Sequence, residues 1–127
     1  MKLKNSLYKI VDKSEQGKGT CYDIVLDSNH TIYQAHFPGE PITPGVCLIQ
    51  IAQELIDDHL QQKYTLRGIK NVKFLSVISP RQHPHVRYLL EKVEFLEDTN
   101  ECKVVAQVLD PGSTSSLAKL SLLFSKR

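Results

Sequence analysis

The stretch from Tyr33 to Gln50 holds the residues whose types and spacing suit chemistry on a carbonyl compound. His36 lies in a loop that also contains Pro38, Pro41 and Pro44. Proline fixes the backbone angle φ, so such a loop is stiff and would hold His36 in one place. Imidazole titrates near neutral pH, and a histidine fixed in this way can accept a proton from a bound ligand.

A helix is expected to begin directly after this loop, and its first amide groups suit the binding of a negatively charged oxygen. Thr43 is a good N-cap, and Pro44 occupies the first helical position, where proline is tolerated. The N–H groups of Gly45 and Val46 would then point out of the positive end of the helix. Because glycine lets a ligand approach the backbone closely, this end suits a carbonyl oxygen and the oxyanion that it becomes.

The segment Gln34-Ala-His-Phe-Pro-Gly-Glu-Pro-Ile-Thr-Pro-Gly-Val46 resembles the signature of the bacterial 3-hydroxyacyl-acyl-carrier-protein dehydratases. That signature reads Gln-Gly-His-Phe-Pro-Gly-x-Pro-x-x-Pro-Gly-Val, and a buried helix follows it. Further along, Gly68-Ile-Lys-Asn-Val-Lys-Phe74 looks like the strand that follows the helix in this family. The positions that match the signature in register are His36, Phe37, Pro38, Gly39, Pro41, Pro44, Gly45 and Val46.

The resemblance implies a fold, an activity and a set of site residues. The fold is the hotdog fold, an α+β arrangement in which an antiparallel sheet wraps around one long helix, and the family works as a dimer whose two sheets join. The activity is dehydration of a 3-hydroxyacyl thioester, on acyl carrier protein or coenzyme A, to the trans-2-enoyl thioester in fatty acid or related acyl-chain biosynthesis. His36 would be the base, and no cofactor or metal is implied. The residues expected to bind the substrate are Phe37, Pro38, Gly39, Pro44, Gly45 and Val46.

One position departs from the family pattern. The family carries a carboxylate one turn inside the helix, which protonates the departing hydroxyl, and an ungapped count from His36 puts Gln50 there. An amide donates a hydrogen bond but cannot deliver a proton, and loss of a general acid typically costs about 10²–10⁴ in rate. Glu54 lies one turn further on the same helix face and is the nearby candidate to replace that acid.

Three functions therefore stay open. The first is a dehydratase in which Gln50 orients the hydroxyl or a water molecule. The second is a catalytically weak or inactive subunit that binds acyl thioesters and pairs with an intact homologue. The third is an acyl thioesterase that uses a helix carboxylate such as Glu54, and His-Phe-Pro-Gly argues against it because it is the dehydratase signature.

The apolar pattern predicts the elements that must position these residues. A helix is expected over residues 44–62, preceded by a loop over residues 28–43. The first half of the helix is apolar around most of its circumference, and Gln50, Gln53, Glu54 and Asp57 form a polar stripe. Such a helix should be buried on most faces within a single α+β domain, residues 1–127. Strands are expected over residues 7–11, 21–26, 66–75, 86–95, 102–109 and 117–124.

Composition narrows the partners and the compartment. The net charge of +2 is too small to favour nucleic acid, although Lys70, Lys73 and Arg81 could attract an acidic carrier protein. Three widely spaced cysteines indicate a reducing compartment. The longest apolar stretch, from Val46 to Ile56, is too short and too polar to span a bilayer. We therefore expect a cytoplasmic homodimer, with higher assembly possible and no membrane insertion.

Overall fold

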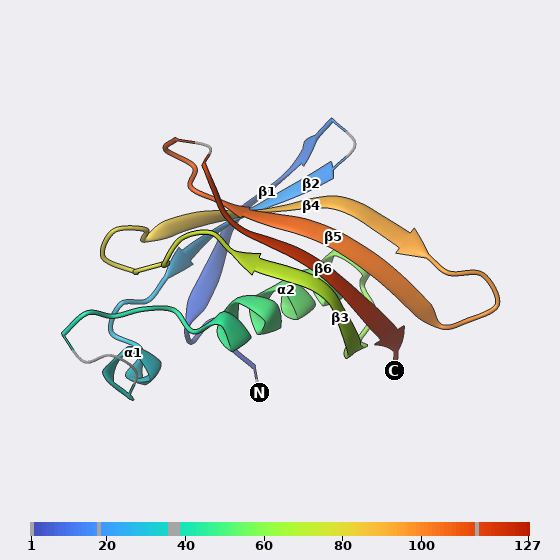
Figure 1. Ribbon diagram of the computed structural model, residues 1–127, viewed down its shortest axis with the longest axis horizontal. Helices are drawn as coiled ribbons and strands as arrows, with labels where there is room; N and C mark the ends of the chain where they lie inside the picture. The colour runs from blue at the N-terminus through green and yellow to red at the C-terminus, as the bar shows by residue number, and fades with distance from the viewer. Residues whose placement is uncertain (1, 18, 36–38, 114) are drawn as a thin grey trace.

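The computed structural model describes residues 2–17, 19–35, 39–113 and 115–127. Its six strands form one antiparallel sheet in the order β1-β2-β4-β5-β6-β3, with a long helix against it (Figure 1). This arrangement confirms the predicted α+β architecture. The elements are β1 (Tyr8–Gln16), β2 (Gly19–Leu26), α1 (Thr31–Ala35), α2 (Gly45–Leu60), β3 (Tyr64–Phe74), β4 (His85–Phe95), β5 (Glu101–Leu109) and β6 (Ser116–Lys126).

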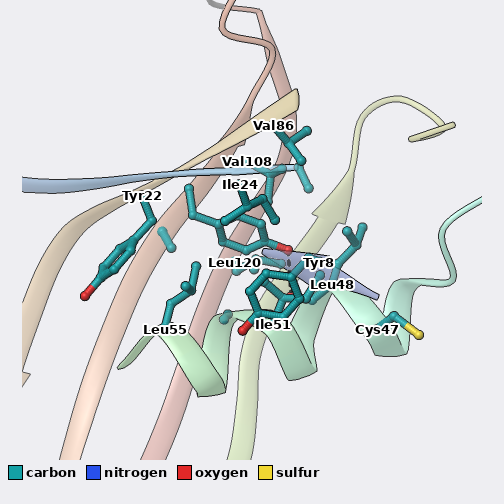
Figure 2. Close-up of a cluster of buried hydrophobic side chains, with 14 of the residues drawn as sticks. Tyr8, Tyr22, Ile24, Cys47, Leu48, Ile51, Leu55, Val86, Val108 and Leu120 are labelled. Atoms are coloured by element: carbon teal, nitrogen blue, oxygen red, sulfur yellow. Dashed lines mark hydrogen bonds between the residues drawn. The ribbon is translucent and has the colours of Figure 1, made fainter. Parts of the chain in front are cut away.

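Helix α2 lies along the concave face of the curved sheet, as its apolar circumference predicts (Figure 1). Leu48, Ile51 and Leu55 of α2 belong to one buried cluster with strand residues such as Ile24 and Val108 (Figure 2). Full burial of one such side chain stabilises the fold by about 1.5–3 kcal/mol. The core therefore fixes the rotation of α2 about its axis and, with it, the direction of the polar stripe.

The segment before α2 differs from the prediction in two ways. The expected loop over residues 28–43 contains the short helix α1, whose Tyr33 is buried. Thr43 does not cap α2, because its hydroxyl is paired with the Tyr33 hydroxyl at 2.9 Å. The N-cap is instead Pro44, in extended conformation with φ −61° and ψ 145°, and it offers no side-chain cap. The pairing with Tyr33 is a tertiary contact that overrides the local capping preference of threonine.

Strands β1 and β3 form the two edges of the sheet. β3 pairs only with β6 within this chain, and its register shifts twice, between Leu66 and Gly68 and between Ile69 and Asn71. Such irregularities increase the local twist of an edge strand. The outer edge of β3 is free to pair with a second chain.

Candidate active site

Among the described residues, two amide groups at the start of α2 have no acceptor. Cys47 N and Leu48 N both donate to Pro44 O, at 2.9 and 3.2 Å. For the N–H groups of Gly45 and Val46, no acceptor lies within hydrogen-bonding distance among the residues that the structure describes. The positive end of a buried 16-residue helix is thus open to an anion or a carbonyl oxygen.

An apolar cavity of about 370 Å³ adjoins this helix end. Its walls come from the start of α2 and from the segment that follows β3, and they include Leu48, Phe74, Val77 and Ile78. Gly45 borders the cavity, and a Cβ atom at this position would lie 2.6 Å from Phe74 Cζ. A glycine is therefore required here unless the Phe74 ring moves.

The loop that carries the histidine motif is held at both ends. Before it, Tyr33 is tied to Thr43 by the hydroxyl pair described above, and Thr43 N donates to Ile78 O at 2.8 Å. After it, Arg81 Nη1 donates to Gly39 O at 3.4 Å. Residues 36–38, that is His36, Phe37 and Pro38, lie outside the described residues. Their predicted roles rest on the sequence alone.

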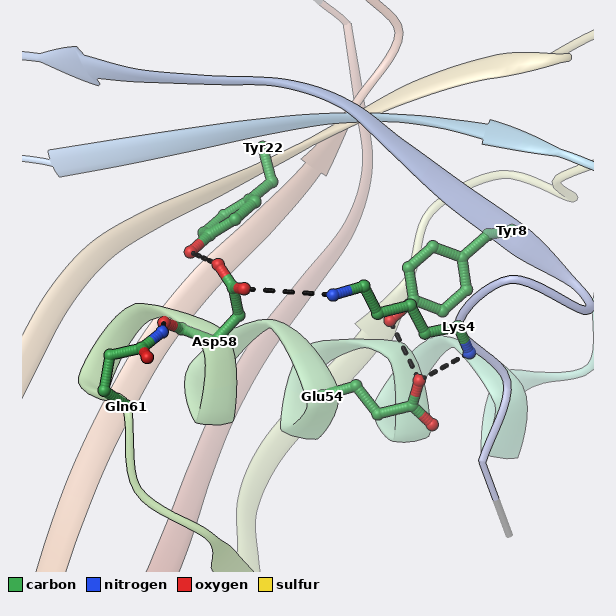
Figure 3. Close-up of polar contacts among 6 residues, drawn as sticks. All are labelled: Lys4, Tyr8, Tyr22, Glu54, Asp58 and Gln61. Atoms are coloured by element: carbon green, nitrogen blue, oxygen red, sulfur yellow. Dashed lines mark hydrogen bonds and ion pairs between the residues drawn. The ribbon is translucent and has the colours of Figure 1, made fainter.

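Gln50 and Glu54, one turn apart on α2, contact each other. Gln50 Nε2 donates to Glu54 Oε2 at 2.8 Å. The same carboxylate accepts a hydrogen bond from Leu3 N at 2.8 Å. It also accepts from Lys4 N at 2.8 Å and from the Tyr8 hydroxyl at 2.9 Å (Figure 3). Glu54 thus ties the N-terminal segment to α2.

These four bonds use all of the acceptor capacity of the Glu54 carboxylate. Two carboxylate oxygens offer about four lone-pair sites, and each oxygen of Glu54 faces two donors. Burial and the negative charge of Glu54 raise the pKa of Tyr8 far above its usual range, so its hydroxyl remains a donor. This environment favours an anchoring carboxylate over a proton donor.

The rest of the polar stripe, and Asp58 next to it in the sequence, also make structural contacts. Gln53 Nε2 donates to Tyr64 O and Asp57 Oδ1 accepts from Tyr64 N, both at 2.9 Å, which fixes the start of β3. Asp58 accepts from the Tyr22 hydroxyl at 2.6 Å and lies 3.9 Å from Lys4 Nζ (Figure 3). The stripe therefore borders a polar groove of about 740 Å³ between the N-terminal segment and the chain after α2.

Sequence reasoning missed Tyr8 and Phe74 as neighbours of the site. Neither contact has a local signature, because Tyr8 lies 46 residues before Glu54 and Phe74 is a terminal strand residue that looks like any other apolar position. The cysteines do not enter the site chemistry, since all three are buried, and burial raises the pKa of the Cys47 thiol. In the described part of the chain, no cluster of three potential metal ligands occurs, and no helix is long and apolar enough to cross a membrane.

A family model described as ApeI-like, the ApeI dehydratase, matches residues 12–109. The chain belongs to the ApeI-like dehydratase family. The matched segment runs from within β1 to the end of β5 and includes the whole of α2 with Gln50 and Glu54. Leu3, Lys4 and Tyr8, which hold Glu54, precede the matched segment.

The chain is also similar to curated dehydratases over part of its length. The 3-hydroxyacyl-acyl-carrier-protein dehydratase FabZ of Clostridium acetobutylicum is 32% identical over 77 residues, which cover 55% of this chain and 55% of that protein. The chain thus spans about half the length of the curated relatives that it matches.

Two solved structures confirm that the fold is the hotdog fold. The dehydratase heterocomplex ApeI:P from Xenorhabdus doucetiae matches with a TM-score of 0.64 and 17% identity, covering 91% of this chain and 96% of that chain. A hypothetical thioesterase with coenzyme A from Streptococcus pneumoniae also gives a TM-score of 0.64, with 7% identity, over 94% of this chain and 85% of that chain.

Proposed function

We propose that this protein removes water from 3-hydroxyacyl thioesters carried by acyl carrier protein, giving trans-2-enoyl thioesters. The observation that carries the proposal is the pair of amides at Gly45 and Val46, which open at the start of a buried helix directly after the histidine motif. Membership in a dehydratase family supports the reaction class. The FabZ relatives, described as acting on acyl-carrier-protein substrates, support the choice of carrier.

In the proposed reaction, His36 removes a proton from C2 of the substrate. The electron pair forms the C2–C3 double bond, and the bond between C3 and its hydroxyl breaks. Negative charge develops on the thioester oxygen, and the amides of Gly45 and Val46 stabilise it. Because these donors are fixed by the helix, they need no reorganisation during the reaction. Gly39 and Pro44, together with Phe37 and Pro38 of the same motif, would shape the site around the thioester.

The departing hydroxyl needs a proton to leave as water. Gln50 cannot supply it, and the Glu54 carboxylate is occupied by four hydrogen-bond donors. We therefore infer that His36, once protonated, returns the same proton to the hydroxyl, while Gln50 orients the leaving group. The atoms balance, since one substrate gives one enoyl thioester and one water. A single residue acting in turn as base and acid is slower than a matched pair, and we expect modest turnover.

The experiment is substitution of His36. His36→Ala should reduce turnover of a 3-hydroxyacyl carrier-protein substrate by at least about 10²-fold, the lower range for a catalytic acid–base group. His85→Ala, at an exposed position at the start of β4, is the matched control and should leave the rate unchanged. Enoyl thioester formation is followed by its ultraviolet absorbance. Equal rates in both variants would remove His36 from the mechanism, and release of free thiol would indicate a thioesterase.

A second candidate function also follows from the amide at position 50, where the family carries its general acid. In it, the chain is a weak or inactive subunit whose acid comes from an intact homologue, and one of the structural relatives is described as a dehydratase heterocomplex. Turnover by the purified chain alone would favour the first function. Turnover only after addition of a homologue would favour the second.

We also propose that two copies join along β3. β3 carries exposed apolar side chains, Ile69 at 53% and Phe74 at 51% exposure. Light scattering at micromolar concentration should give twice the monomer mass of 14.4 kDa. Ile69→Asp should shift the mass toward the monomer, because it places a charge in the joint. Val11→Asp lies at a 56% exposed position on the opposite edge of the sheet and should leave the mass of the dimer unchanged. A monomeric mass for the wild-type protein would contradict the proposal.

A further inference from the structure

The Phe74 ring lies against the first turn of α2, which carries the amides of Gly45 and Val46. A Cβ atom on Gly45 would lie 2.6 Å from Phe74 Cζ and 2.8 Å from Cε2, so the edge of the ring rests on the Gly45 backbone. In an α-helix the Cα–Cβ direction is tilted toward the N-terminus. The ring therefore lies against the first turn of α2, close to the first N–H groups.

The ring is held loosely for an aromatic side chain. Phe74 is the last residue of β3, opposite Ala118 of β6, and 51% of it is exposed. A phenylalanine in a well-packed core would bury nearly all of its surface. In the single chain little packing is lost when the ring turns away from Gly45, and in the dimer proposed above the ring lies at the end of the strand that forms the joint.

The surroundings suit an acyl chain once the ring has moved. Phe74 is a wall of the apolar cavity of about 370 Å³ beside Gly45, together with Leu48 and Ile78. At the rim, Leu75 and Val77 are 53% and 57% exposed. A thioester whose carbonyl contacts the start of α2 would therefore have an apolar space directly beside it, with Phe74 between the two.

We propose that Phe74 is the gate of the acyl-thioester site and a determinant of its chain-length preference. The ring covers the start of α2 in the free protein, and it turns aside when the thioester carbonyl binds the amides of Gly45 and Val46. In the open position it contacts the acyl chain. This inference rests on the proposed function, because the carbonyl is that of the proposed substrate. When the ring is turned aside in only a fraction of the molecules, the apparent affinity for the thioester is reduced by that fraction.

The first test needs no catalysis. The chain has six glycines, so selective labelling of glycine with ¹⁵N and ¹³C gives a simple nuclear magnetic resonance spectrum. The Gly45 signals should carry a ring-current shift in the wild type that disappears in Phe74→Ala. Phe95→Ala is the matched control, since Phe95 also ends a strand and is 61% exposed. It should leave Gly45 unchanged. A Gly45 signal that is equal in the wild type and in Phe74→Ala would overturn the gate.

The second test adds a stable ligand, the amide analogue of a 3-hydroxyacyl pantetheine thioester, with a short or a long acyl chain. In the wild type, either ligand should move the Gly45 Hα shift toward its value in Phe74→Ala. Phe74→Ala should bind the short ligand on the order of three- to tenfold more tightly than the wild type does. The long ligand should gain less, because its chain loses the contact with the ring. The dissociation constants come from the same titrations.

The outcomes separate the gate from the function beneath it. Binding that shifts other glycines, while Gly45 keeps its ring-current shift, would overturn the gate and leave the proposed function standing. Equal gains for the short and the long ligand would overturn the role of Phe74 in chain-length preference. A loss of the Gly45 ring-current shift in Phe74→Ala, combined with no ligand-induced change at any glycine, would overturn the proposed function, and the gate with it.

Discussion

Glu54→Ala should lower the free energy of unfolding by about 2–4 kcal/mol, although Glu54 is only half-buried. The substitution leaves Leu3 N, Lys4 N and the Tyr8 hydroxyl without their acceptor. An unsatisfied buried donor costs about 1–3 kcal/mol, and we take the lower part of this range because water can reach some of the three. Urea unfolding measures the change, and the melting temperature should fall by roughly 10 °C.

Glu54→Gln makes the test specific for the acceptor role. A carboxamide keeps the size of the side chain but turns one of the two oxygens into a donor. In one orientation its NH₂ group faces Leu3 N, and in the other it faces Lys4 N. At least one backbone N–H therefore loses its acceptor in either case, and this variant should recover less than half of the lost stability.

Glu97→Ala, at an exposed position after β4, is the matched control and should change the free energy of unfolding by less than about 0.5 kcal/mol. If Glu54→Ala changed the free energy of unfolding as little as Glu97→Ala does, the N-terminal segment would not be anchored by Glu54. Full recovery of stability in Glu54→Gln would mean that the side chain contributes by packing and not as a four-fold acceptor.

The elements of this fold could be predicted because burial leaves a periodic pattern in the sequence. Each predicted strand has its counterpart, although β1 ends five residues beyond its predicted limit at residue 11, and α2 begins and ends within two residues of the expected limits. α1 could not be predicted, because five residues are too short to show a helical period. Its single buried side chain, Tyr33, is anchored by a tertiary contact to Thr43, which local propensity does not reveal.

The site could be predicted only where its residues are close in the sequence. The amides of Gly45 and Val46 and the polar stripe follow from the start and the period of one helix. The contacts of Glu54 with Leu3 and Tyr8 join residues 51 and 46 positions apart, and an amphipathic pattern indicates only that a face is polar, not which group it meets. The same holds for Phe74, whose burial pattern as a strand residue gives no sign that it rests on Gly45.

The Gln50–Glu54 contact changes what Gln50→Glu is expected to do. Gln50 Nε2 and Glu54 Oε2 are 2.8 Å apart, so the substitution places two carboxyl groups within hydrogen-bonding distance. Two carboxylates at this separation cannot both be ionised without a large cost, and the pair retains one proton. The introduced carboxyl becomes the donor to Glu54, and its pKa in the folded protein rises above the unfolded value of about 4.3.

This raised pKa makes the stability of Gln50→Glu depend on pH. A group whose pKa is higher in the folded state binds its proton more tightly there. Its contribution to stability is complete below the unfolded pKa of about 4.3 and is lost as the pH rises through the folded pKa. The free energy of unfolding relative to wild type should therefore fall between about pH 4 and the raised pKa and then stay level.

The same proton gives the variant the general acid that the native chain lacks. Below the raised pKa, Gln50→Glu should dehydrate a 3-hydroxyacyl carrier-protein substrate on the order of tenfold or more faster than wild type. This rate advantage should disappear over the pH range in which the variant loses its added stability.

The double variant Gln50→Glu with Glu54→Gln is the matched control, because it exchanges the two groups and leaves one carboxyl in the pair. Its stability should lack the added pH dependence. A tenfold gain that persists at high pH, or a stability difference that is flat with pH, would show that the introduced carboxyl does not share a proton with Glu54. In that case the carboxyl would act on the substrate independently of the N-terminal anchor.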